Sequence, residues 1–264
     1  MNKREYFASA LTILLVIGLM VYCFVHPTII HNETHKANLN GVSLVYEMRG
    51  YTRGEPVVLL HGNGGSHNDL QTIAKVLSDS GYLVWSPDSR GQGANEPLTE
   101  YHYADMAEDM HLFVDQIIQN HYPERTVKPA VFGWSDGGIV ALMTEVMYPL
   151  TWSAIITSGA NIDPDCGAWD LKKERAHPRD TSALYQMMLY EPNMTAADMQ
   201  TIKCPALIVA GEYDLIRLDH TRLIGDNIPN GEVLIIPDAD HGSHIINSYE
   251  MADTLLHYLR KINY

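Results

Sequence analysis

The sequence predicts an α/β fold built on a doubly wound, mostly parallel sheet. Short, continuous apolar runs are typical of strands that are buried on both faces, and segments with one apolar helical face alternate with these runs. A chain of 264 residues is also long enough to bury one sizeable core. The expected strands after the first hairpin are 56–60, 82–86, 127–132, 154–157, 206–210 and 233–236. Alternation of strand and helix favours parallel pairing through crossover connections.

The first folded element is predicted to be a hairpin. Its strands are 37–39 and 42–49, and Asn40-Gly41 between them is a strong two-residue turn signal. Gly81 ends a predicted helix over 73–80, and a long amphipathic helix is expected over 103–121. Further helices are expected over 138–147 and 251–262.

The interval from 161 to 203 breaks the alternation. A connection of this length between two strands is usually functional, and we expect a small helical cap over the carboxyl edge of the sheet. Its several Met and Tyr residues are expected mainly to pack the cap, and as a group they indicate an apolar, adaptable pocket roof.

The N-terminal segment is predicted to be a membrane anchor. Residues 8–25 carry no charge and approach the length that spans a bilayer, and no cleavage site of small residues follows them. Lys3 and Arg4 precede this run, so the positive-inside rule places residues 30–264 outside the cytoplasm. The predicted organisation is an anchor and tether over 1–30, with residues 27–35 as a polar tether, and a folded domain over 31–264.

Charge and cysteine content narrow the function classes. The formal charge is −14, from 18 basic and 32 acidic residues, and no basic stripe occurs, which argues against nucleic acid or an anionic membrane surface as a partner. We favour isolated buried thiols at Cys166 and Cys204, and a disulfide bridge between them is the alternative. No motif implies a metal or an organic cofactor.

Gly133-Trp134-Ser135-Asp136-Gly137 is the most informative motif. It reads G-x-S-x-G between an apolar run and a predicted helix. A serine on such a sharp turn needs small neighbours, and the turn exposes its hydroxyl at a helix N-terminus that favours developing negative charge. Ser135 is therefore the candidate nucleophile.

A base and an orienting acid are expected after later strands. Asp214 follows the strand 206–210, and His241 follows the strand 233–236. The carboxyl ends of parallel strands meet at one edge of the sheet, so these side chains should approach Ser135. Glu212 is the alternative acid and His244 the alternative base.

The run from His61 to Ser66 follows the strand 56–60, where donors for an oxyanion belong. We predict that the backbone N–H groups of Asn63 and Asp136 form the oxyanion hole. His61 is expected to orient this loop. Asp88 and Arg90 are expected to stiffen a neighbouring turn through an ion pair and to have no catalytic role.

These motifs, in the order H-G-N-G-G-S, D-S-R-G-Q-G, G-W-S-D-G-G, G-E-Y-D and D-A-D-H-G, resemble the α/β-hydrolase superfamily from about residue 40 onward. Within this match, the segments 133–139, 158–161 and 204–209 resemble the biphenyl-hydrolase-like group, which includes the valacyclovir-hydrolase type. That resemblance implies that Asp136 pairs with the ammonium group of an α-amino acid ester, and Asp136 and Trp134 are the candidate substrate-binding residues. The alternative is that Asp136 only favours the helix N-terminus. The short cap and the N-terminal anchor depart from the group.

The sequence therefore predicts a membrane-anchored serine hydrolase of small carboxylic esters that forms an acyl-enzyme on Ser135. Two alternatives remain: a peptidase-like or carbon–carbon bond hydrolase of the same fold, and a ligand receptor that keeps a slow hydrolase site.

Overall fold

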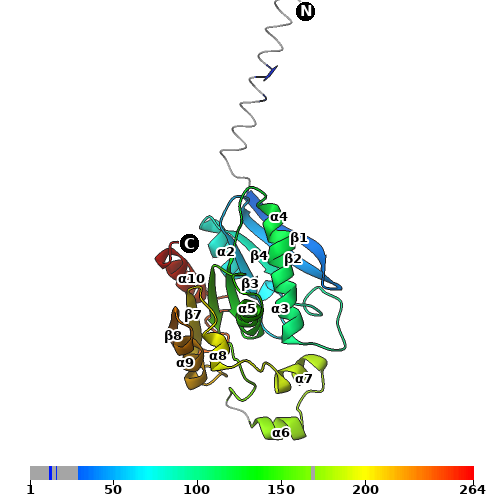
Figure 1. Cartoon of the computed structure of the whole chain (residues 1–264), viewed down its shortest axis with the longest axis vertical. Helices are drawn as coiled ribbons and strands as arrows, with labels where there is room; N and C mark the ends of the chain where they lie inside the picture. The colour runs from blue at the N-terminus through cyan, green and yellow to red at the C-terminus, as the bar shows by residue number, and fades with distance from the viewer. Residues whose placement is uncertain (1–11, 14–15, 17–28, 168–169) are drawn as a thin grey trace, which may run out of the picture.

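The computed structural model describes residues 12–13, 16, 29–167 and 170–264. Within them, an eight-stranded sheet is flanked by helices (Figure 1). The strands are β1 Ile29–Leu39, β2 Val42–Tyr51, β3 Pro56–Leu60, β4 Leu83–Pro87, β5 Ala130–Trp134, β6 Ala154–Ser158, β7 Ala206–Tyr213 and β8 Gly231–Asp240. Their order is β1-β2-β4-β3-β5-β6-β7-β8, with β1 and β2 antiparallel to their neighbours and the other pairs parallel. The predicted mostly parallel α/β sheet is confirmed.

The helices cover both faces of this sheet. They are η1 His67–Leu70, α2 Gln71–Asp79, α3 Tyr103–Leu112, η2 Phe113–Ile118, α4 Gln119–His121, α5 Asp136–Met147, α6 Leu171–Ala176, α7 Ala183–Tyr190, α8 Ala196–Met199, α9 Leu218–Asn227 and α10 Glu250–Lys261. The predicted long helix over 103–121 is present as α3, η2 and α4, with a π-helical turn at η2. Helix α9 was not anticipated from the sequence.

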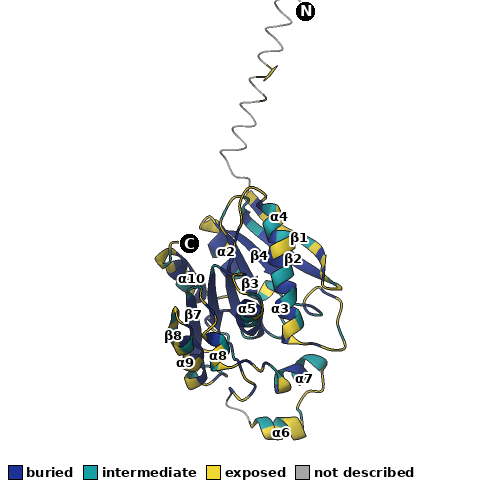
Figure 2. Ribbon diagram, in the orientation of Figure 1, coloured by how far each residue is buried: buried dark blue, intermediate teal, exposed yellow. Residues whose placement is uncertain are grey.

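Two apolar layers hold the helices to the sheet. One layer lies under α2 and α10, and the other lies under α3, α5, α8 and α9. Alternate side chains of the parallel strands enter opposite layers, so a strand such as β3 is buried at every position. Burial is therefore continuous through the middle of the sheet, whereas α6 is largely exposed (Figure 2).

The start of the domain differs from the prediction. Residues 29–35, expected to form part of a polar tether, belong to β1 and pair with β2, for example Glu33 opposite Met48. The hairpin turn at Asn40-Gly41 is confirmed, with positive φ at both residues. The tether prediction is wrong here because the polar residues of β1 lie on an exposed edge strand, where the backbone pairs even when side chains face solvent.

The predicted membrane anchor over 8–25 lies almost entirely outside the described residues. Among the residues that the structure describes, no helix is both long enough and apolar enough to cross a membrane.

The segment from 161 to 203 contains three short helices, α6, α7 and α8, in agreement with the predicted helical cap. Met187 and Met194 are buried within it, whereas Met188 faces the cavity described below. Cys166 and Cys204 are both free thiols, so the bridge is excluded. Burial raises the pKa of each thiol to about 12.

Candidate active site

Ser135 lies on a strained turn between β5 and α5. Its φ is 54°, in the left-handed region that a residue with a side chain rarely adopts. The turn is so tight that a Cβ on Gly133 would lie 2.2 Å from the Gly137 carbonyl oxygen. Glycine is required there for this close approach, and the turn directs the Ser135 side chain away from the sheet core.

The structure brings Ser135, His241 and Asp214 together. The Nε2 atom of His241 lies 3.0 Å from the Ser135 hydroxyl oxygen, and its Nδ1 atom lies 2.6 Å from Asp214 Oδ1. These distances allow a proton to pass from the hydroxyl to the imidazole while the carboxylate fixes the ring orientation. Three residues separated by up to 106 positions in the chain thus form one continuous relay.

Asp214 is held in its ionised form. Its side chain is fully buried, which acts to raise its pKa, but hydrogen bonds from His241 and from the backbone N–H groups of Ile216 and Gly211 outweigh burial. The pKa of Asp214 therefore lies below its usual value. A permanent negative charge at this point favours the imidazolium that forms when His241 accepts a proton.

The alternative acid and base lie elsewhere. Glu212 is exposed and accepts the backbone N–H of Asp238. His244 is buried, its Nε2 lies 2.8 Å from the Ser158 hydroxyl, and burial lowers its pKa. Neither residue has a hydrogen bond to Ser135 or His241 within the described residues.

The predicted oxyanion donors are adjacent to the nucleophile. Asp136 begins α5, so its N–H has no partner in the preceding helical turn. Among the described residues, no hydrogen bond occupies the backbone N–H of Asn63 or of Asp136. Both groups therefore remain available to a ligand.

The side chains of these two residues are bonded to each other. Asn63 Nδ2 donates to Asp136 Oδ2 at 2.8 Å, and the Tyr103 hydroxyl forms a second hydrogen bond to the same carboxylate. Burial nevertheless raises the pKa of Asp136 above its usual value. A buried carboxylate with neutral donors alone lacks the cation that would balance its charge.

A small cavity of about 70 Å³ opens beside Ser135. Its lining residues come from the sheet edge, from α3 and from the cap, and they are Tyr103, Ser135, Asp136, Asn161, Pro164, Met188, Glu191, Leu215, Ile216 and His241. Trp134 is not among them. Its indole N–H donates to the His241 carbonyl oxygen at 2.8 Å, so its observed contact supports the His241 loop rather than the cavity wall.

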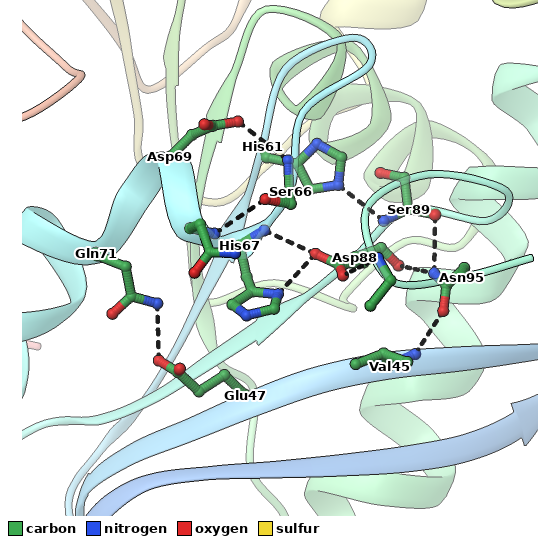
Figure 3. A network of polar contacts seen from close by, with 12 residues as sticks. Val45, Glu47, His61, Ser66, His67, Asp69, Gln71, Asp88, Ser89 and Asn95 are labelled. Atoms are coloured by element: carbon green, nitrogen blue, oxygen red, sulfur yellow. Dashed lines mark hydrogen bonds and ion pairs between the residues drawn. The ribbon is translucent and has the colours of Figure 1, made fainter.

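His61 and Asp88 hold together the loops that follow β3 and β4 (Figure 3). His61 Nε2 accepts the backbone N–H of Ser89 at 2.9 Å, in agreement with the predicted orienting role, and burial lowers its pKa. Asp88 is fully buried, lies within hydrogen-bonding distance of the His67 ring and accepts the N–H groups of His67 and Ala94. These bonds join the loop after β3 to the loop after β4.

The predicted ion pair between Asp88 and Arg90 is wrong. Arg90 instead forms two hydrogen bonds of 2.6 Å with Asp109 on α3 and a third of 3.1 Å with Asp105. The planar guanidinium matches a carboxylate across the loop–helix interface, where two parallel bonds are possible. Sequence proximity favoured Asp88, but its oxygens are occupied by His67 and Ala94.

Within the described residues, no group of three or more His, Cys, Asp or Glu side chains is arranged to hold a metal ion.

The chain is similar in sequence to known hydrolases. A family model described as serine aminopeptidase, S33, matches residues 53–177. The chain is 28% identical to serine hydrolase BPHL of Homo sapiens over 240 residues, covering 80% of each protein. It is 24% identical to Lipase 1 of Psychrobacter immobilis, covering 85% of this chain and 86% of that protein.

Solved structures show the same fold. A putative lipase from Acinetobacter baumannii superposes with a TM-score of 0.72 at 17% identity, covering 88% of this chain and 92% of that one. A structure described as a membrane phospholipase A superposes with a TM-score of 0.73 at 15% identity, covering 98% and 99%.

A strand-to-helix turn that carries a serine, joined to a histidine and a buried aspartate, defines a serine hydrolase site on an α/β sheet. The fold and this arrangement of side chains are those of the α/β-hydrolase superfamily, and the similarity to serine hydrolases and lipases agrees with a serine hydrolase.

Proposed function

We propose that this protein is a membrane-anchored serine hydrolase that cleaves small carboxylic esters, with α-amino acid esters among its substrates. The observation that carries the proposal is the hydrogen-bonded relay from Ser135 through His241 to Asp214. The similarity to lipases and to a serine hydrolase supports ester substrates. The uncharged run over 8–25, which follows Lys3 and Arg4, supports the anchor and an extracytoplasmic site.

In this mechanism, the Ser135 oxygen attacks the ester carbonyl while His241 Nε2 takes the hydroxyl proton. The negative charge on the carbonyl oxygen is stabilised by the backbone N–H groups of Asn63 and Asp136. His241 then gives its proton to the departing alkoxide, which leaves as an alcohol. Water attacks the acyl-enzyme with proton transfer to His241, and the proton returns to Ser135 as the acid is released.

The Asp136 carboxylate supplies the reason to include α-amino acid esters. It is buried beside the nucleophile, its hydrogen-bond donors are neutral, and no Lys or Arg lines the described cavity. A substrate ammonium group would provide the missing cation and would hold the carbonyl carbon near Ser135. A substrate that lacks the ammonium group would leave the desolvated Asp136 carboxylate unpaired. Such a pair therefore discriminates strongly between substrates with and without a free amine.

The test is hydrolysis of p-nitrophenyl butyrate and of an aminoacyl p-nitrophenyl ester by residues 29–264. The Ser135→Ala variant is expected to lose at least about 10³-fold in kcat with an unchanged circular dichroism spectrum, because the side chain fills no core. Ser43→Ala, an exposed serine on β2, is the matched control. Activity retained by Ser135→Ala would contradict the assignment.

The description of the matching family model favours a second candidate, an aminopeptidase-like reaction on an amide with a free amine. An aminoacyl p-nitroanilide distinguishes the two, since its turnover above that of the matched ester would identify the peptidase. Turnover far below about 1 s⁻¹ on every substrate would favour the receptor alternative instead.

A further inference from the structure

Glu191 places a second carboxylate beside the nucleophile. The residue follows the last turn of α7 in the cap, and it lines the same cavity as Ser135 and Asp136. Its Oε2 atom accepts the backbone N–H of Tyr103 at 3.0 Å, and its Oε1 atom lies 2.6 Å from His102 Nδ1. These bonds join the cap to the first turn of α3, where α7 and α3 lie next to each other (Figure 1).

Tyr103 forms a hydrogen bond to each of the two acidic side chains. Its backbone N–H binds Glu191, and its hydroxyl binds the Asp136 carboxylate. Glu191 and Asp136 therefore lie at opposite ends of one fully buried tyrosine. The imidazole of His241 is the basic group of the described lining, which contains no lysine or arginine.

Glu191 also retains capacity for a ligand. Each carboxylate oxygen has about two acceptor positions, and the hydrogen bonds from Tyr103 and His102 use one on each oxygen. The side chain is 25% exposed, and Glu191 lines the cavity beside Ser135. His102 is shared with Glu100, which lies 3.1 Å from its other ring nitrogen.

We propose that Glu191 is a specificity-determining residue that selects esters with an α,ω-diamino acyl group, such as lysyl and ornithyl esters. The α-ammonium would bind Asp136 and the side-chain ammonium would bind Glu191, because both carboxylates line the cavity that contains Ser135. This inference rests on the proposed function, and it specifies the acyl group. A second, partly desolvated ion pair is expected to improve kcat/KM by about tenfold.

The test compares lysine ethyl ester with norleucine ethyl ester, which has the same chain without the terminal ammonium. The unsubstituted enzyme is expected to prefer the lysyl ester by about tenfold in kcat/KM. Glu191→Gln should abolish that preference while leaving the norleucyl ester within about twofold, because the amide oxygen still accepts the Tyr103 N–H. Glu191→Asp, which keeps the charge, should retain a lysyl preference, and Glu100→Gln is the matched control, since Glu100 contacts His102 outside the cavity.

An equal loss on both esters in Glu191→Gln would show that Glu191 only fastens the cap, and an unchanged ratio would also overturn the inference. Failure of the proposed function has a different signature, since the unsubstituted enzyme would then turn over neither ester. A variant that does not fold is recognised by circular dichroism, and the decision then rests on Glu191→Asp, whose loss of the lysyl preference would overturn the inference.

Discussion

Replacing Asp214 by asparagine is expected to lower kcat by about 10–10⁴-fold without disrupting the fold. In the native protein, Oδ1 accepts both His241 Nδ1–H and the Ile216 N–H, and Oδ2 accepts the Gly211 N–H. Asparagine has the same shape but a single acceptor oxygen. Each of its two orientations therefore has a distinct cost.

With the amide oxygen toward His241, the imidazole keeps its tautomer but loses the facing negative charge. A hydrogen bond to a charged group is worth about 1.5–3 kcal/mol, which corresponds to roughly 10–10² in rate. With the amide nitrogen toward His241, the ring proton moves to Nε2, which can no longer accept the Ser135 proton. That change of tautomer costs about 10⁴-fold in the serine protease triad.

The assay is the initial rate of p-nitrophenyl butyrate hydrolysis at saturating substrate, with Glu212→Gln as control. Glu212 accepts the Asp238 N–H at the surface, so its variant should keep nearly full activity. An Asp214→Asn enzyme with unchanged kcat, or a larger loss in Glu212→Gln, would refute the assigned acid.

Further predictions concern stability and location. Arg90→Ala should reduce the free energy of unfolding in urea by about 3–5 kcal/mol, because it leaves the Asp109 charge buried without its partner, and a loss below about 1 kcal/mol would contradict this. Asp136→Asn should raise Tm at about pH 7 but not at about pH 3. Burial raises the pKa of Asp136 in the folded protein, whereas in the unfolded chain the carboxyl ionises at about pH 3.9. Above that pH the native carboxyl therefore favours unfolding, and asparagine removes this effect. An equal Tm difference at both pH values would exclude this cause. The full chain should sediment with membranes after a carbonate wash, whereas residues 29–264 should remain active in the supernatant; recovery of the full chain in that supernatant would refute the anchor.

Local signals in the sequence predicted most of the elements around the site. The bounds of β3 match the predicted apolar run, and the Ser135 turn follows from its glycines, because these features depend on neighbouring residues. The positions of Asp214 and His241 after their strands were also predictable, since parallel strands end at one edge of the sheet. The observed distances agree with that expectation.

Features that depend on distant partners were not predictable in the same way. Residues 29–35 pair as part of strand β1 because β2 offers an edge, although the side chains of β1 are polar and lack a clear apolar alternation. Arg90 binds Asp109 because α3 packs against its loop. Helix α9 was missed between β7 and β8, although its buried His220, Thr221 and Ile224 recur at helical spacing.

The sequence by itself determined the class of fold and the order of Ser135, Asp214 and His241, because short-range patterning and strand direction suffice for both. The tertiary structure alone decided which side chains share the cavity. Glu191 enters it from the cap, 88 residues after Tyr103, through a contact that no local pattern encodes. Such contacts form only when the cap packs on α3, and the complete fold therefore sets the charge of the cavity.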